Sequence, residues 1–247
     1  MANSETGHAK NVANFEDLIS FCTGYGASYN PTKTTIQLSS LVTLHTNSKN
    51  AIAEVNTAAT PWTNAVSARE ITFEPLSKLI TRVINALDAS EVPKQIVNNA
   101  KTIARKIQGK RATPKSSSTS SDPSAPVEEN PKTISTSQMS FDNRIENMDK
   151  LVQLLAAQSG YAPNENDLTV AALTNLLTSM RTVNTAAKEA YTPLSNARIA
   201  RNEILYQPDT GLVDIAGAAK KYVKSVFGAT SPQYKQLSGL KFISPGR

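Results

Sequence analysis

"SYNPTKTTI", residues Ser28–Ile36, and "GYAPNENDL", residues Gly160–Leu168, are the two stretches that decide the fold. Both contain Tyr-x-Pro and a polar turn, and each precedes a long segment with helical periodicity. Proline fixes φ and keeps the preceding residue extended, while the aromatic ring gives the connection something to pack. The pair therefore predicts the same helix-to-helix connection twice in one chain.

These stretches belong to a longer internal match. Shifted by 132 positions, residues 29–69 match residues 161–201 without a gap at 12 of 41 positions, where chance gives about 3. One inserted residue then moves the shift to 133, and the match continues to Ala86 and Ala219. We predict an internal duplication. Its repeat-matched structural positions are Tyr29, Pro31, Pro61, Arg69, Pro75, Tyr161, Pro163, Pro193, Arg201 and Pro208.

The match divides the chain into two copies joined by a linker. Residues 111–139 are rich in Ser, Pro and Thr, which predicts a flexible segment that buries too little surface to fold. Residues 1–11 are predicted to form a polar N-terminal tail. The remaining domains are then helical repeat A, residues 12–110, and helical repeat B, residues 140–247.

Apolar residues recur at helical spacing throughout both copies, and no stretch alternates over the length of a strand. Asn14 and Ser140 are predicted to cap the first helix of each copy. The long second helix reaches Pro61 or Pro193 after a threonine, where either a new helix begins or one helix is kinked. The predicted fold class is all-α, with two tandem pseudo-symmetric antiparallel helical bundles.

Composition limits the classes of protein. The single cysteine excludes an intramolecular disulfide and a cysteine-based zinc cluster. We expect no secretory signal, because the first residues lack an apolar core, and no transmembrane segment, because no apolar run approaches the roughly 20 residues that a bilayer requires. The predicted localisation is cytoplasmic.

Side chains that could carry catalysis are few. His45 has no acidic or cysteine neighbour at helical spacing, and repeat B has Leu177 in its place, so we interpret it as a half-buried structural residue. Cys22 has no matching histidine motif and is interpreted as a small apolar residue. "GYGAS", at residues 24–28, follows a helix rather than a strand, which favours a helix end over a phosphate loop. We predict no enzyme, no catalytic or metal-ligating residues and no cofactor.

The strongest basic cluster lies at the end of repeat A. Residues 101–115 contain basic side chains and no acidic one, and such a stripe could contact phosphates. No aromatic residues are interleaved for base stacking, so nucleic-acid or anionic-surface binding is an alternative rather than the first hypothesis. The candidate basic contact patch consists of Lys101, Arg105, Lys106, Lys110, Arg111 and Lys115.

The long helix of repeat A is low in charge. From Thr34 to Thr60 it carries only Lys49 and Glu54, among Ser, Thr, Asn and Ala. Such a helix is either central in its bundle or packs against another protein. The predicted function is a non-enzymatic structural or protein-interaction protein that self-assembles, or binds a different protein, through its long helices. A membrane-active helical bundle is a second alternative, and no long uncharged hairpin supports it.

The opening "MANSETGHAKNVANFEDLISF", residues 1–21, together with the doubled Tyr-x-Pro, resembles duplicated helical proteins of Bacteroidota that have no known activity. The resemblance implies a bacterial origin and no particular function.

Overall fold

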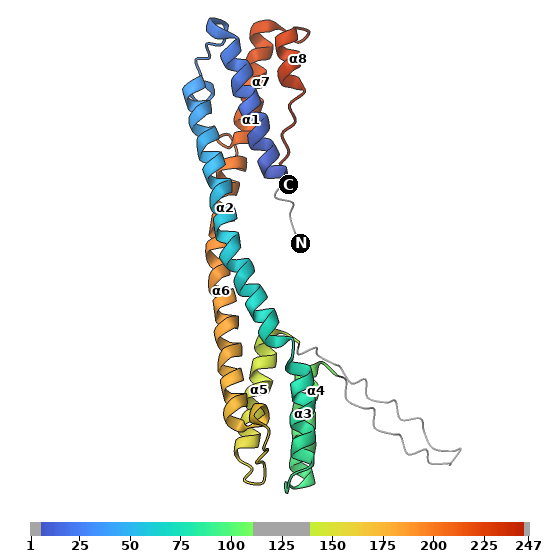
Figure 1. The fold of residues 1–247 in the computed structure, drawn as a ribbon. Helices are drawn as coiled ribbons and strands as arrows, with labels where there is room; N and C mark the ends of the chain where they lie inside the picture. The colour runs from blue at the N-terminus through green and yellow to red at the C-terminus, as the bar shows by residue number, and fades with distance from the viewer. Residues whose placement is uncertain (1–5, 111–138, 245–247) are drawn as a thin grey trace, which may run out of the picture. The chain divides into compact units, whose positions relative to one another are not determined.

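The structure is a computed structural model that describes residues 6–110 and 139–244. These residues form helices joined by short connections, and they contain no strand, which confirms the all-α class. The elements are α1 (Thr6–Gly24), η1 (Gly26–Ser28), η2 (Thr34–Ile36), α2 (Leu38–Phe73), α3 (Leu76–Asp88), α4 (Lys94–Gln108), α5 (Phe141–Ala156), η3 (Asn166–Leu168), α6 (Val170–Tyr206), α7 (Leu212–Phe227) and α8 (Pro232–Ser238) (Figure 1).

The two long helices continue through their prolines. Pro61 lies inside α2 and Pro193 lies inside α6, so of the two possibilities left open by the sequence a single helix is the one observed. A proline inside a helix removes one backbone hydrogen bond and crowds the preceding turn. Both prolines are exposed, so water can reach the carbonyl that loses its partner.

The described chain divides into two compact units that cut across the two sequence copies. Unit 1 comprises residues 6–63 and 189–244, and unit 2 comprises residues 64–110 and 139–188. Each unit thus combines the first half of one predicted copy with the second half of the other predicted copy. This partition differs from the predicted bundles of residues 12–110 and 140–247, because α2 and α6 each contribute to both units.

Unit 1 is built on a core between α1, α7 and the parts of α2 and α6 within the unit. Phe15, Leu18 and Cys22 of α1 are fully buried, and Ala216 and Ala219 of α7 are buried in the same cluster. The small α7 residues allow α1 to approach closely. The short α8 covers the end of this core, and Figure 1 shows it beside α7.

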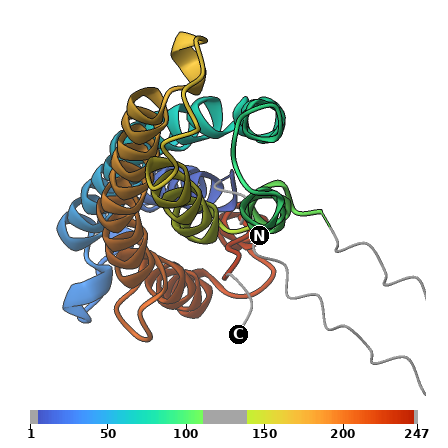
Figure 2. The ribbon, with the colours of Figure 1, turned by 90° about the horizontal axis from the view of Figure 1, so that it is seen from below.

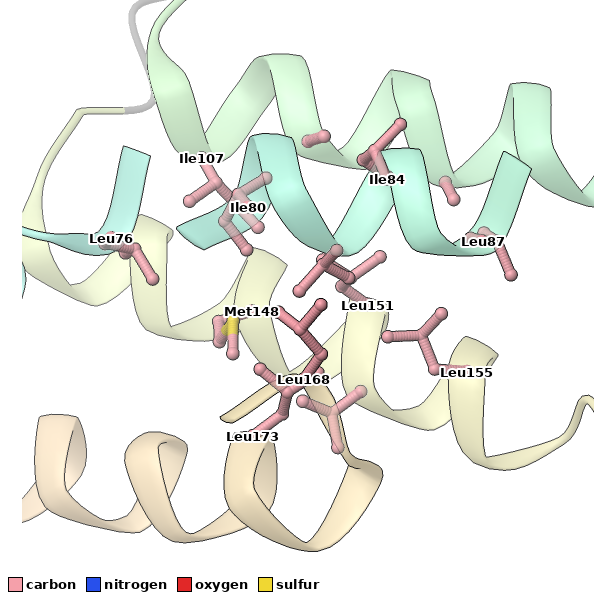
Figure 3. Packing of buried hydrophobic residues seen from close by; sticks show 14 of the residues in the cluster. Leu76, Ile80, Ile84, Leu87, Ile107, Met148, Leu151, Leu155, Leu168 and Leu173 are labelled. Atoms are coloured by element: carbon pink, nitrogen blue, oxygen red, sulfur yellow. The ribbon is translucent and has the colours of Figure 1, made fainter. Parts of the chain in front are cut away.

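Unit 2 has an apolar core between α3, α4, α5 and the beginning of α6 (Figures 2 and 3). Ile80 of α3 and Leu151 of α5 point into the same buried cluster, and Leu173 of α6 lies on its other side. The α5 helix begins as predicted, with the Ser140 hydroxyl accepting a hydrogen bond from the Asn143 amide. This bundle is held together mainly by the burial of apolar surface, which stabilises a fold by about 25 cal/mol per Å².

The two Tyr-x-Pro turns contain the same tyrosine hydrogen bond. The buried Tyr29 hydroxyl donates to the carbonyl of Ile36 at 2.7 Å, and the Tyr161 hydroxyl donates to the carbonyl of Leu168 at 2.8 Å. Each bond spans seven residues and ties the turn to the 3-10 helix that precedes the long helix. Burial raises the pKa of Tyr161 to about 12, with Glu165 and Asp167 adding to the shift.

The N-terminal segment differs from the prediction. Helix α1 begins at Thr6, eight residues before the predicted cap Asn14, and His8 and Asn11 are buried rather than part of a polar tail. The physical reason is distant in sequence: the Asn11 side chain donates to the Ile243 carbonyl at 2.7 Å and accepts from the Ile243 amide at 2.9 Å. The predicted linker, apart from residue 139, lies outside the described residues.

Candidate functional site

A pocket of about 530 Å³ lies in unit 2 beside the Tyr161 turn. One wall is the turn itself, residues 160–165, and the other is the C-terminal half of α3 with Ala86, Ala89 and Ser90. Gly160 lets the turn approach the α3–α4 connection, because a side chain at that position would lie 2.7 Å from the Glu91 carbonyl oxygen. Its volume falls within the range of small-molecule pockets.

The edge of this pocket carries an ion pair. Arg82, a lining residue, makes a bidentate contact with Asp167, in which Nη2 lies 3.1 Å from Oδ1. Hydrogen bonding from Arg82 holds the pKa of Asp167 below its usual range. Both side chains are exposed, so the pair orients the pocket edge and adds little stability.

Unit 1 places an aromatic ring on its own Tyr-x-Pro turn. The rings of Tyr222 in α7 and Tyr29 meet edge to face, with centroids 5.3 Å apart and planes at 90°. The Tyr222 hydroxyl also accepts a hydrogen bond from the Asn30 amide at 3.2 Å. The corresponding helix of unit 2, α3, has no aromatic residue.

A second pocket, of about 390 Å³, lies in unit 1 between the start of α2 and the start of α7. Hydroxyl groups dominate its α2 side, with Ser39, Ser40 and Thr43, and Ile215 contributes apolar surface from α7. The Thr43 hydroxyl already donates to the Ser39 carbonyl at 2.9 Å. No charged side chain lines this pocket, which gives it no obvious means of selecting a ligand.

The predicted basic patch is only partly assembled in the described residues. Lys101 pairs with Asp88 at 2.8 Å, and the Arg105 guanidinium donates to the Thr102 hydroxyl at 3.0 Å. Lys106 and Lys110 are exposed at the end of α4. The other two predicted members, Arg111 and Lys115, lie outside the described residues.

The repeat-matched arginines serve the packing within each unit. The Arg69 guanidinium lies 4.0 Å from the centre of the Phe141 ring and 3.4 Å from the Asn184 side-chain oxygen. Arg201 is buried and donates to the Asn202 side chain at 2.9 Å. The repeat-matched prolines have mixed environments. Pro31 is buried, Pro163 lines the unit 2 pocket, Pro75 precedes α3, and Pro208 lies between α6 and α7.

The histidine and cysteine candidates are held by other parts of unit 1. The His45 Nε2 atom lies 3.6 Å from a Glu16 carboxylate oxygen, a partner that local spacing did not reveal because it comes from α1. Burial raises the pKa of the Cys22 thiol to about 11, although a hydrogen bond with Tyr29 acts to lower it. A thiol in that position is a poor nucleophile at neutral pH.

The outer surface of α2 within unit 1 is uncharged along one line. Thr46, Asn50, Ala53, Thr57 and Thr60, which we call the outer stripe, are all exposed and follow 3-4 spacing. The Thr46 and Thr60 hydroxyls donate to the carbonyls four residues earlier, at 3.0 and 3.4 Å. Their donors are therefore used within the helix.

Comparison of the sequence with protein-family models and curated proteins, and of the fold with solved structures, finds no match. The resemblance to helical proteins of Bacteroidota therefore stays a prediction. Among residues 6–110 and 139–244, no helix combines the length and apolar character needed to cross a bilayer.

Proposed function

We propose that this chain is a non-enzymatic structural or protein-interaction protein that pairs with a second copy of itself through the outer stripe of α2. The observation that carries the proposal is the surface chemistry of that stripe. An exposed helix surface normally carries charged residues, whereas Lys49 and Glu54 are the only charges between Thr34 and Thr60, and both stand beside the stripe.

Small side chains at 3-4 spacing suit helix-on-helix packing. They let two backbones approach, and the spacing keeps the contact along one seam. Because threonine hydroxyls bond to their own helix, the stripe has fewer donors that must lose water when another helix covers it. Half-exposed Tyr191 of α6, whose ring centroid lies 6.2 Å from that of Trp62, adds aromatic surface of the kind enriched at interfaces.

Light scattering after size exclusion tests this proposal on the full chain at low and high salt. We expect a mass of twice 26.5 kDa that does not depend on salt, because the seam is uncharged. Asn50→Glu should return the chain to a monomer, because two like charges would be buried facing each other across the seam. The matched control, Asn98→Glu on the exposed side of α4, should remain dimeric. A wild-type monomer would overturn self-association.

We also propose that the two sequence copies are structural copies that have exchanged their second halves. The repeated tyrosine hydrogen bond and the composition of each unit support this. It is the arrangement that a homodimer with swapped halves would acquire on fusion into one chain.

A protease site placed within residues 111–138 tests the exchange. After cleavage the two fragments should elute together in native buffer and separate only in denaturant, since each unit needs helices from both. Independent elution of the fragments in native buffer would contradict the exchange. This result does not depend on whether the chain forms dimers, because the cleaved pair can be followed by gel at any mass.

A further inference from the structure

The turn that lines the pocket of unit 2 has a counterpart in unit 1, and there the side chain of Tyr222 packs on it. Tyr29 and Asn30 of unit 1 align with Tyr161 and Ala162 of unit 2 at the shift of 132, and both of the latter line the pocket. In unit 1 the ring of Tyr222 packs on the first of these residues and its hydroxyl bonds to the amide of the second. The turn is thus a platform that accepts a hydroxylated ring.

The helix that faces the platform differs between the units. At the shift of 133, Ala89, the residue that follows α3, aligns with Tyr222 of α7. Ala89 lines the pocket together with Ala86 and Ser90. By this alignment, unit 2 has small side chains at the position of the Tyr222 ring of unit 1. The volume of about 530 Å³ is ample for one ring with substituents.

We propose that the unit 2 pocket binds a p-hydroxyphenyl group. The ring packs edge to face on Tyr161, as aromatic pairs prefer, and its hydroxyl accepts a hydrogen bond from the Ala162 amide. Asn85 and Arg82 at the α3 side provide polar contacts for substituents beyond the ring. This site is separate from the outer stripe and does not rest on self-association.

Titration of the full chain with p-cresol, followed by ligand-observed and backbone-amide NMR, tests the site. We expect a dissociation constant on the order of 1 mM, typical of a ligand of this size, and a shift of the Ala162 amide resonance. Toluene, which lacks the hydroxyl, should bind roughly fivefold more weakly, as the loss of one hydrogen bond predicts. Equal binding of toluene and p-cresol, or no binding of p-cresol, would overturn the proposal.

Two variants locate the binding. Ala89→Tyr should weaken p-cresol binding at least tenfold, because its own ring then occupies the platform. Ala157→Tyr is the matched control: it is also an exposed alanine just after a helix, here α5, and it does not line the pocket. Unchanged binding by folded Ala89→Tyr would place the ligand elsewhere and contradict the assignment.

Tyr222→Ala gives an independent reading in unit 1. Removal of that ring should create a second p-cresol site, raise the stoichiometry from one to two, and let p-cresol raise the melting temperature of the variant. Failure to gain a site would contradict the equivalence of the two platforms.

N-acetyl-tyrosinamide distinguishes the sources of the group. Binding as tight as that of p-cresol would indicate a tyrosine side chain of a polypeptide. Binding of p-cresol alone would indicate a small phenolic compound. Both outcomes retain the p-hydroxyphenyl assignment.

Discussion

In each unit a short helix packs on the end of a long helix through two aromatic rings, but the rings differ in chemistry. In unit 1, α1 meets the end of α6 through His8 and Tyr206, whose ring centroids lie 5.5 Å apart with Nδ1 2.6 Å from the hydroxyl. In unit 2, α5 meets the end of α2 through Phe141 and Phe73, an edge-to-face pair at 4.9 Å. At the shift of 133, Phe73 at the end of α2 aligns with Tyr206 at the end of α6.

The surroundings of each ring pair match its chemistry. The polar pair of unit 1 has Asn11, whose side-chain amide lies 3.3 Å from the Tyr206 hydroxyl. The apolar pair of unit 2 has two guanidinium groups over its faces, with Arg144 5.2 Å from the centre of the Phe73 ring. The two ring contacts therefore rest on different interactions, hydrogen bonds in unit 1 and cation–π contacts in unit 2.

The largest expected effect concerns the cores beneath these contacts. Leu18 of α1 and Leu151 of α5 are both fully buried, so Leu18→Ala and Leu151→Ala should each lower the free energy of unfolding by about 2–5 kcal/mol. Urea denaturation followed by circular dichroism measures this. Val42→Ala, on a half-exposed site, serves as the control and should cost much less. A Leu151→Ala cost below about 1 kcal/mol would contradict the packing of unit 2.

The next effect concerns the turns. Tyr29→Phe and Tyr161→Phe each leave a buried carbonyl without its donor, which should cost about 1–3 kcal/mol. The same denaturation experiment applies, and the two costs should agree within about 1 kcal/mol if the turns are equivalent. If only one of the two variants lowered the free energy of unfolding strongly, the shared hydrogen bond would not contribute equally to stability in the two turns.

A smaller effect is expected at the ring contact of unit 1. Tyr206→Phe removes the hydroxyl that meets His8 and Asn11, which should lower the free energy of unfolding by about 0.5–1.5 kcal/mol. Tyr191→Phe is the control, since Tyr191 is half exposed. If Tyr206→Phe were stabilising, the polar pair would not depend on its hydrogen bonds.

The smallest effect lies on the surface of unit 2. Hydrogen bonding from Lys188 at 2.6 Å, with Asn184 contributing, lowers the pKa of Asp142. Since the folded pKa lies below the unfolded one, the stabilisation is complete above the unfolded value, near 3.9, and is lost as pH falls through the folded value. Asp142→Asn should therefore remove less than about 1 kcal/mol at pH 7, because the pair is exposed. The difference from wild type should vanish in strong acid; a difference that grew there would contradict the assignment.

Much of the fold follows from local pattern. Apolar residues at helical spacing predicted helices in both halves of the sequence, and residues 6–110 and 139–244 contain helices and no strand. The Tyr-x-Pro signal correctly placed a turn before each long helix. The start of α1 was missed because Asn11, a polar residue, was expected to be exposed. Its hydrogen-bond partners are more than 190 positions away in the sequence, so local pattern did not indicate that it is buried.

The candidate pocket was not predictable from the sequence. Its turn residues were recognised as part of a predicted repeat, but no local pattern showed that Ala86, Ala89 and Ser90 would line a pocket beside that turn. The basic patch stays a prediction. The tertiary fold adds that its member Lys101 pairs with Asp88, a contact that the spacing of basic residues did not indicate.

Helices, turns and apolar helix faces could be predicted from local sequence, because periodicity and proline act over a few residues. The pairing of the two halves became visible only in the folded chain. An apolar helix face packs against another apolar surface. The two predicted copies have similar apolar patterns, so local sequence does not tell which of them supplies that surface. The choice falls to contacts between residues far apart in the chain, and those contacts bring α1 to α7 and α5 to α4.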